Sequence, residues 1–361
     1  MNFQLTGLHI LFSFLLWSIL IFAYRKNFYS RIDNADNYKL FLLVVIVYST
    51  FGFCTGDYPN YAELYERITR TTNIRAMHME DFYIWLIEIL PNNYNLWRFF
   101  VWGLSTIVAV WTFKKYRLNS QFACLIFALM LMQYFAAPRN SLGYMVLFLG
   151  VAWLFYPKHK TLATMLIGIL IILSSTFFHK SMFLYILVIC ISLIPFKKSM
   201  YIISLILFPV LYISFIKLSV FILPYIAGDT ESLSSGMMYL EKDEVLVANF
   251  NGLIRLLIQR TPIVILVFLA VKSIVFKGEK IPYVFKVLLN YIYILIYISM
   301  LFYGQKTSGL LSTRFWDASI YSVMIFTAYY FYSRPSKLLT KCLFLLLFAN
   351  LFDFAYLLYA N

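Results

Sequence analysis

Basic side chains stand beside apolar stretches at several points in a chain whose residues are 62% apolar and only 13% charged. A charged group next to lipid is costly unless it snorkels or is paired, so such residues are functional candidates. Arginine grips phosphate oxygens with two parallel N–H groups, whereas lysine offers a point charge. We therefore interpret these cations and their polar neighbours as candidate ligands of a phosphate-bearing substrate. They are Arg139 with Asn140, His179 with Lys180, Arg255, Arg260, and Arg314 with Asp317.

Each of these residues also has a plainer explanation. The guanidinium of Arg139 can snorkel to lipid phosphates, and His179 can be a hydrogen-bonded structural residue. Arg314 and Asp317 have the spacing of a local ion pair. Arg255 and Arg260 are harder to explain in this way, because both enter one apolar stretch. They precede Pro262, which is expected to end or kink that helical turn.

A carboxylate flanked by aromatic residues follows the second apolar stretch. Asp57, Tyr58 and Tyr61 form a candidate site in which the carboxylate acts and the rings stack on sugars. The alternative is a turn aspartate with interfacial aromatic residues. The residues that follow are explained structurally, since Asn60 and Glu63 fit a capping box. The pairs Glu63/Arg67 and Glu66/Arg70 have (i, i+4) spacing.

No metal site or cofactor is expected. The run from Glu241 to Glu244 resembles an acidic metal-binding pair, but a solvated charged run is the better explanation. The cysteines lack metal-ligand spacing. The segment from Glu80 to Pro91 reads as a short amphipathic helix in the membrane interface, with a mainly structural role.

The elements that must position these residues are transmembrane helices. Soluble proteins carry about 25% charged residues, nearly twice the fraction found here. The sequence predicts an all-α, polytopic integral membrane protein with about twelve spans, its single transmembrane domain covering residues 1–361. The predicted spans are Leu5–Tyr24, Tyr38–Phe53, Trp97–Phe113, Phe122–Phe135, Leu142–Phe155, Leu162–Phe178, Met182–Phe196, Tyr201–Leu223, Leu253–Val275, Tyr283–Tyr303, Phe315–Tyr332 and Leu338–Leu358.

Alternate connections between these spans are rich in lysine and arginine, which fixes an orientation by the positive-inside rule. Both termini then lie outside, as do the two long connections at about 54–96 and 224–252. All the candidate cations fall at outer ends of spans. The net charge of +14 is therefore a signal of topology, and binding of nucleic acid is not expected.

Four short segments together resemble the EpsG family, whose members are bacterial membrane proteins of exopolysaccharide, capsule and O-antigen clusters, grouped with the Wzy polymerases. The segments are Gly56–Tyr61 after the second span, Pro138–Ser141 before the fifth, Phe177–Ser181 after the sixth, and Arg314-Phe315 opening a late span. The stretch 224–252 carries no matching feature.

The resemblance implies a glycosyltransferase of the bacterial inner membrane that polymerises lipid-linked oligosaccharide repeat units on the outer leaflet. The substrate would be an oligosaccharide on a polyprenyl diphosphate, surrounded by membrane lipids. A flippase and a chain-length regulator are possible partners. Outer arginines would stabilise the leaving diphosphate, and Asp57 or His179 would be the general base.

Two other classes of protein remain open. A transporter or flippase of an anionic glycolipid would also need a cationic cavity, but it should show internal repeats and polar residues at the membrane midplane. A membrane O-acyltransferase would use histidine chemistry, with its polar residues inside or midway across the membrane.

Overall fold

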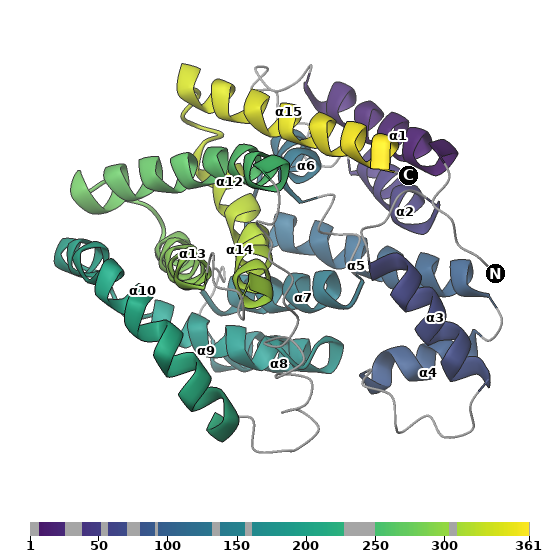
Figure 1. Cartoon of the computed structure of the whole chain (residues 1–361), viewed down its shortest axis with the longest axis horizontal. Coiled ribbons are helices and arrows are strands. Elements are labelled where there is room, and N and C mark those ends of the chain that lie inside the picture. The colour runs from purple at the N-terminus through teal and green to yellow at the C-terminus, as the bar shows by residue number, and fades with distance from the viewer. Residues whose placement is uncertain are drawn as a thin grey trace. The chain divides into compact units, whose positions relative to one another are not determined.

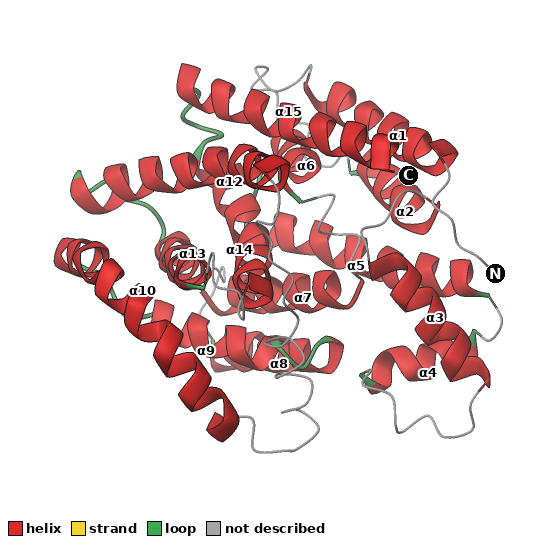
Figure 2. Cartoon of the chain, in the orientation of Figure 1, coloured by secondary structure: helices red, strands yellow, loops and turns green. Residues whose placement is uncertain are grey.

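The computed structural model describes residues 7–25, 38–51, 57–70, 80–90, 93–131, 138–155, 161–226, 250–302 and 309–360. Within these ranges the regular structure is entirely helical, which confirms the all-α prediction (Figures 1 and 2). The helices of the first half are α1 (Gly7–Arg25), α2 (Lys39–Phe51), α3 (Asp57–Arg70), α4 (Asp81–Ile89), α5 (Tyr94–Lys115), α6 (Ser120–Met130), α7 (Pro138–Phe155) and α8 (Leu162–Phe178). Those of the second half are α9 (Met182–Ser192), α10 (Lys198–Ile226), α12 (Phe250–Val271), the π-helical turn η3 (Lys272–Phe276), α13 (Tyr283–Leu301), α14 (Gly309–Tyr330) and α15 (Lys337–Ala360).

Three described helical segments are long and apolar enough to cross a membrane by length and composition, namely Tyr94–Lys115, Ile258–Phe276 and Tyr283–Leu301. Seven shorter apolar segments accompany them, which include most of α1 and α2 and the first part of α10. The predicted topology has about twelve spans. That number of spans and the outer location of both termini remain predictions.

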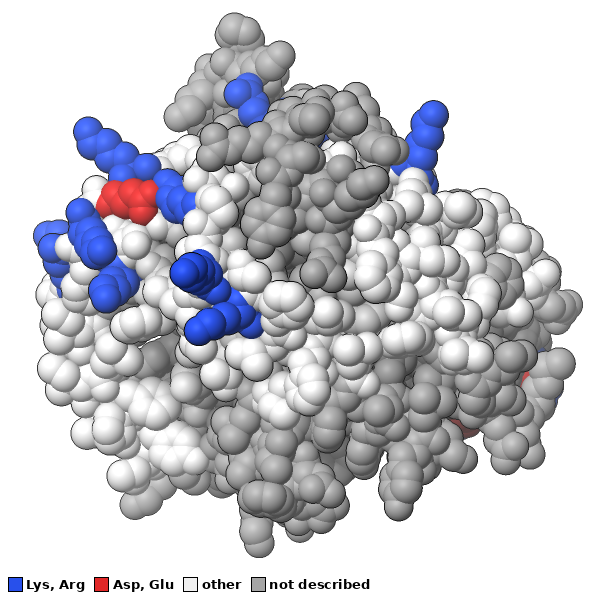
Figure 3. Space-filling model, turned by 90° about the horizontal axis from the view of Figure 1, so that it is seen from above, with Lys and Arg blue, Asp and Glu red and all other residues white. Residues whose placement is uncertain are grey.

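Apolar side chains on the surface of these helices indicate contact with lipid. In α8 the buried residues are Gly168, Ile172 and Ser175, while Leu162 is 75% and Phe177 is 72% exposed. Water-soluble proteins rarely expose apolar side chains along a whole helix. On the face drawn in Figure 3, basic side chains stand in groups beside wide areas without charge. These features point to a membrane protein.

The chain packs as two compact units. The first comprises Met1–Leu187 and Met324–Asn361, and the second comprises Val188–Val323. The boundaries fall within α9 and α14. This division describes local packing and does not test the predicted single transmembrane domain.

In the first unit, α7 and α8 form a tightly packed antiparallel pair (Figure 1). A Cβ on Gly150 would lie 2.7 Å from the backbone nitrogen of Ile172, and one on Gly168 would lie 2.8 Å from that of Leu154. Small residues at such a crossing let two helix backbones approach closely, as is common in membranes. Because the helices run in opposite directions, the start of α7 and the end of α8 lie at the same end of the pair. That end carries Arg139 and His179.

The second unit joins α10 to α13 by polar contacts. Tyr201 donates to Asn290 Oδ1 over 2.9 Å, and Tyr297 donates to the Ser204 carbonyl over 2.7 Å. Asn290 Nδ2 also donates to the carbonyl oxygens of Ser192, the last residue of α9, and of Ile194 just beyond it. Buried polar groups in a helix bundle require such partners, so these bonds fix how α9, α10 and α13 pack.

Three local predictions need correction. Asn60 lies inside α3, which begins at Asp57, so the predicted cap at Asn60 is wrong. Pro262 was predicted to end or kink its helical turn; it does not end the helix, because α12 runs through it, and a kink there remains a prediction. The fourth predicted span, Phe122–Phe135, is an 11-residue helix that ends at Met130 within the described residues. The predicted ion pairs Glu63–Arg67 and Glu66–Arg70 are confirmed, the latter at 3.4 Å.

Candidate functional site

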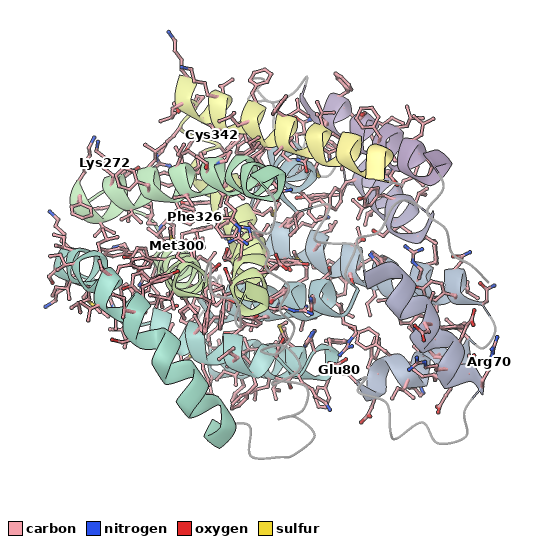
Figure 4. The ribbon with its side chains drawn as sticks, viewed as in Figure 1. Arg70, Glu80, Lys272, Met300, Phe326 and Cys342 are labelled. Atoms are coloured by element: carbon pink, nitrogen blue, oxygen red, sulfur yellow. The ribbon has the colours of Figure 1, made fainter. Side chains whose placement is uncertain are left out.

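The first turn of α4 carries a buried carboxylate. Glu80 is the N-cap residue, and its carbonyl accepts the first backbone hydrogen bond of the helix, from Tyr83 at 2.9 Å. Its side chain is only 4% exposed. A buried carboxylate requires charged or hydrogen-bonding partners. Figure 4 labels Glu80, which lies where α4 meets α8.

Arg139, the second residue of α7, supplies the main partner. Its Nη2 atom donates a hydrogen bond of 2.8 Å to Glu80 Oε1. Its Nε atom lies 2.7 Å from Oε2. This is a contact between charges and not a hydrogen bond, because the Nε–H bond does not point at an acceptor with the required geometry. The carboxylate therefore faces one edge of the guanidinium with both oxygens. The arginine side chain is 18% exposed, so this ion pair is largely shielded from water.

The turn between α8 and α9 brings two more groups to the same carboxylate. His179 ends α8 in an extended conformation, and its carbonyl accepts from the Met182 amide, which closes the turn. The Lys180 backbone amide donates to Glu80 Oε1 over 3.2 Å. His179 Nδ1 lies 3.8 Å from the same oxygen, so a protonated His179 would add its charge.

The histidine ring is oriented by its own turn. The Ser181 backbone amide donates to His179 Nδ1 over 3.2 Å, and the Ser181 hydroxyl lies 2.9 Å from the same nitrogen. A nitrogen that accepts a hydrogen bond carries no proton. Neutral His179 in this arrangement therefore has its proton on Nε2, and that edge of the ring is a hydrogen-bond donor.

The surroundings of Glu80 act on its ionisation in opposite directions. Burial disfavours the charged carboxylate, but the hydrogen bond and charge of Arg139 outweigh burial, and a protonated His179 adds to them. They hold the pKa of Glu80 below its ordinary value of 4.5. Glu80 is thus ionised at neutral pH, with Arg139 and the Lys180 amide donating to it and the His179 ring beside it.

Aromatic contacts hold α4 in place. The Phe82 ring lies 5.0 Å from that of Phe178, which immediately precedes His179. Tyr83 is fully buried, 6.4 Å from the Trp97 ring of α5. Tyr65 of α3 accepts from the Asn93 amide over 3.0 Å and donates to the Leu90 carbonyl. These contacts tie α3, α4, α5 and α8 together around the carboxylate.

The structure thus brings Arg139, His179 and Lys180 together within the first unit. The Lys180 side chain is exposed, so its backbone amide makes the contact with Glu80. Asn140 is half-buried beside Arg139. Asp57, Tyr58 and Tyr61 lie in the first turns of α3, but their side chains are outside what the structure describes.

The remaining predicted residues lie in the second unit. Arg260 of α12 stacks on the ring of Trp316, with its guanidinium carbon 4.6 Å from the ring centre. Arg314 and Asp317 flank that tryptophan on α14, and both are half-buried. Within this unit, therefore, Arg260 lies beside the helix segment that carries Arg314 and Asp317. Arg255 belongs to α12, and its side chain is outside the described residues.

Two charged residues at these helix ends were missed by sequence reasoning. Glu80 was assigned a structural role in an amphipathic helix. Arg98 was not singled out, although it lies inside a predicted span, a signal that was available. Arg98 is 1% exposed, donates to the Ser49 carbonyl at the end of α2, and lies 5.0 Å from the Trp102 ring and 5.6 Å from that of Tyr94.

Among the described residues, no three histidine, cysteine, aspartate or glutamate side chains gather as metal ligands would. The acidic run from Glu241 to Glu244 lies outside those residues. The expectation of a site without metal remains a prediction.

Comparison with known protein families finds a match. The model of the EpsG family matches residues 37–361, which is nearly the whole chain. No curated protein and no solved structure matches the chain.

Proposed function

Since the chain belongs to the EpsG family, confirming the resemblance seen in its sequence, we propose that it is a polymerase of lipid-linked oligosaccharide repeat units. In the proposed reaction, a growing glycan moves from its polyprenyl diphosphate carrier to a sugar hydroxyl of the next repeat unit. Family membership supports a role in polysaccharide synthesis. The specific reaction and the residues that perform it are our proposal.

The observation that carries this proposal is the convergence of Arg139, His179 and the Lys180 amide on one buried anion. The groups come from two helix junctions separated by a 40-residue stretch of sequence (positions 139 and 179). A guanidinium and a neutral histidine N–H are suitable donors to phosphate oxygens, and the Lys180 amide, which donates to Glu80, holds the turn that carries His179 beside Arg139. This end of α7 and α8 is therefore suited to an anionic group carried by a lipid.

Glu80 contacts the Nε–Nη2 edge of the Arg139 guanidinium, and the two Nη atoms form a second edge. Arginine carries five N–H donors in a rigid plane, and can serve a carboxylate and a phosphate from different edges. We propose that this second edge binds the diphosphate of the lipid-linked donor.

The transfer forms one bond and breaks another. The acceptor hydroxyl oxygen attacks the anomeric carbon, the bond from that carbon to the diphosphate oxygen breaks, and the hydroxyl proton passes to a base. The diphosphate leaves with an added negative charge. Fixed cations placed where this charge develops lower the barrier.

The two candidate bases are distinguished by the hydrogen bonds of His179. Its Nδ1 atom accepts from Ser181, so its Nε2–H is suited to donate to the departing diphosphate. We assign His179 this donor role and leave the base to Asp57, the first residue of α3. The role of Asp57 rests on the sequence alone. Tyr58 and Tyr61 would then stack on sugar rings.

The outer leaflet follows from the distribution of basic residues in the sequence, which places the start of α7 and the end of α8 outside. This assignment is also part of the proposal. Arg255, Arg260, Arg314 and Asp317 would lie on the same side and form a second group of substrate contacts in the second unit.

The test is polymerisation by the purified full-length chain in vesicles, with polyprenyl-diphosphate-linked repeat units as the only substrate. We expect products of increasing numbers of repeat units and release of free polyprenyl diphosphate. A transporter would move the intact glycolipid between leaflets without breaking the glycosyl bond. Translocation of intact substrate with no released carrier lipid would overturn the proposed reaction.

A further inference from the structure

We propose that Glu80 is a positioning residue that sets the orientation of the Arg139 guanidinium and ties it to the His179–Lys180 turn. This inference rests on the proposed function, because it concerns how the diphosphate ligand Arg139 is held. The residue was assigned a merely structural role from the sequence, and neither family membership nor composition points to it.

Glu80 contacts both helix junctions at once. Oε1 accepts from Arg139 Nη2 at 2.8 Å and from the Lys180 amide at 3.2 Å, and His179 Nδ1 lies 3.8 Å from it. Oε2 lies 2.7 Å from Arg139 Nε. A single carboxylate therefore determines where the guanidinium lies relative to the histidine turn.

Glu80 is also held in this position. Its backbone caps α4, with its carbonyl accepting from Tyr83 and Ile84. The neighbouring Phe82 ring packs against Phe178, and Tyr83 is fully buried. A residue fixed on both its backbone and its side chain cannot swing out to make room for substrate. We therefore exclude a role in which Glu80 occupies the diphosphate site of the free protein and leaves it when substrate binds.

The charge of Glu80 also limits the role that it can have. Arg139 keeps Glu80 ionised at neutral pH, and a carboxylate whose pKa lies below its ordinary range is a weak proton acceptor there. Glu80 is thus unsuited to be the general base of the transfer. The ionised carboxylate contacts Nε and Nη2 of Arg139 and thereby holds the guanidinium plane in one orientation. Misplacing a reacting or stabilising group by about 1 Å typically costs about a hundredfold in rate.

The experiment is a double-mutant cycle of polymerisation by the purified full-length chain. Glu80→Gln keeps the size of the side chain and removes its charge. We expect it to lower kcat about thirtyfold to a hundredfold while KM changes less, because Arg139 acts chiefly on the leaving group. In an Arg139→Lys background there is no planar guanidinium to orient. Adding Glu80→Gln to that background should therefore lower kcat by a further factor of less than about three.

Glu88→Gln is the matched control. Glu88 lies on the exposed side of the same helix and should give the kcat of the unaltered chain. All rates are normalised to folded protein, measured by the monodisperse fraction in size-exclusion chromatography. A purely structural role for Glu80 would reduce that fraction and leave kcat per folded molecule unchanged.

The outcomes separate this inference from the proposed function. Full kcat in Glu80→Gln together with a strong loss in Arg139→Lys would overturn the positioning role and leave the polymerase assignment intact. The positioning role would also be overturned if the kcat of the double variant fell by the product of the two single losses. Such a product means that the two free-energy effects are additive and the residues act independently. Full activity in Arg139→Lys would instead overturn the proposed role of Arg139 in binding diphosphate.

Discussion

Gly150 of α7 lies against Gly168 of α8 so closely that a Cβ added to Gly150 would be 3.0 Å from the Gly168 carbonyl oxygen and 2.7 Å from the Ile172 nitrogen. Backbone atoms cannot move aside as a flexible side chain can. This crossing determines how far the start of α7 lies from the end of α8. It therefore determines the distance between Arg139 and His179.

Gly150→Ala should separate the two helices. Overpacking a tight contact costs about 1–3 kcal/mol, and the site at the end of the pair should open with it. We expect a lower unfolding temperature in detergent and a loss of polymerisation. Gly103→Ala is the control, because a Cβ there would meet nothing within 4 Å. Equal unfolding temperatures for the two variants would contradict the close crossing.

The stability contributed by Glu80 should depend on pH. The pKa of its carboxyl is lower in the folded chain than its ordinary value of 4.5, so its contribution is present in full above that value and is lost as the pH falls through the folded pKa. Glu80→Gln leaves Arg139 with an uncompensated charge and should cost about 3 kcal/mol near neutral pH.

The measurement is the difference in unfolding temperature between the unaltered chain and Glu80→Gln, from pH 7 down to about pH 3. We expect the difference to hold down to about pH 4.5, or to grow where a protonated His179 adds its charge, and to shrink below that pH. A difference that grows as the pH falls below about 4.5 would show that Glu80 is stabilised in its protonated form, contrary to its contacts with Arg139.

Much of this structure follows from local sequence patterns. The apolar runs predicted the helices, and the (i, i+4) spacing of Glu66 and Arg70 predicted their ion pair. Arg139 and His179 stood out because each is a charged or titratable residue in a short reversal between apolar runs. Such features are visible within a few residues of the chain.

The central contact of the site could not be read in this way. Glu80 and Arg139 are 59 residues apart, and their pairing depends on how α4 packs against α8. In the sequence, Glu80 and Asp81 look like the ordinary acidic residues of a helix start, which the helix dipole favours. The start of α3 was misplaced for a related reason, since Asn60 matches a capping box that the longer helix does not use.

The role of His179 can be tested by replacing its ring with side chains of different hydrogen-bonding capacity. If His179 donates through Nε2–H, His179→Gln retains a donor and should keep about a tenth of the polymerisation rate, since one charge-neutral bond is weakened rather than lost. His179→Leu, which has no donor, should lose about a hundredfold or more. Equal, complete loss in both variants would instead indicate that His179 is the general base.

The orientation of the chain can be tested by labelling single cysteines in intact cells, after Cys54, Cys124, Cys190 and Cys342 have been replaced. Glu88→Cys on α4 and Lys197→Cys between α9 and α10 are both at exposed positions. We expect an impermeant thiol reagent to label the first and to spare the second until the membrane is permeabilised. The reverse pattern would place the Glu80–Arg139 site on the cytoplasmic side.

The account depends most directly on whether Arg139 binds the leaving diphosphate, and Arg139→Lys tests this with the charge retained. Lysine snorkels as well as arginine does, so a role limited to lipid headgroups predicts almost no effect. Lysine cannot serve Glu80 with one edge and a phosphate with another.

The measurement is the ladder of polymer on the cell surface, with the amount of folded chain in the membrane as the reference. We expect normal amounts of protein and a loss of polymer on the order of a hundredfold, the usual cost of removing one transition-state donor. A full-length ladder from normally expressed Arg139→Lys would contradict the account and leave Arg255, Arg260 and Arg314 as the remaining candidate ligands of the diphosphate.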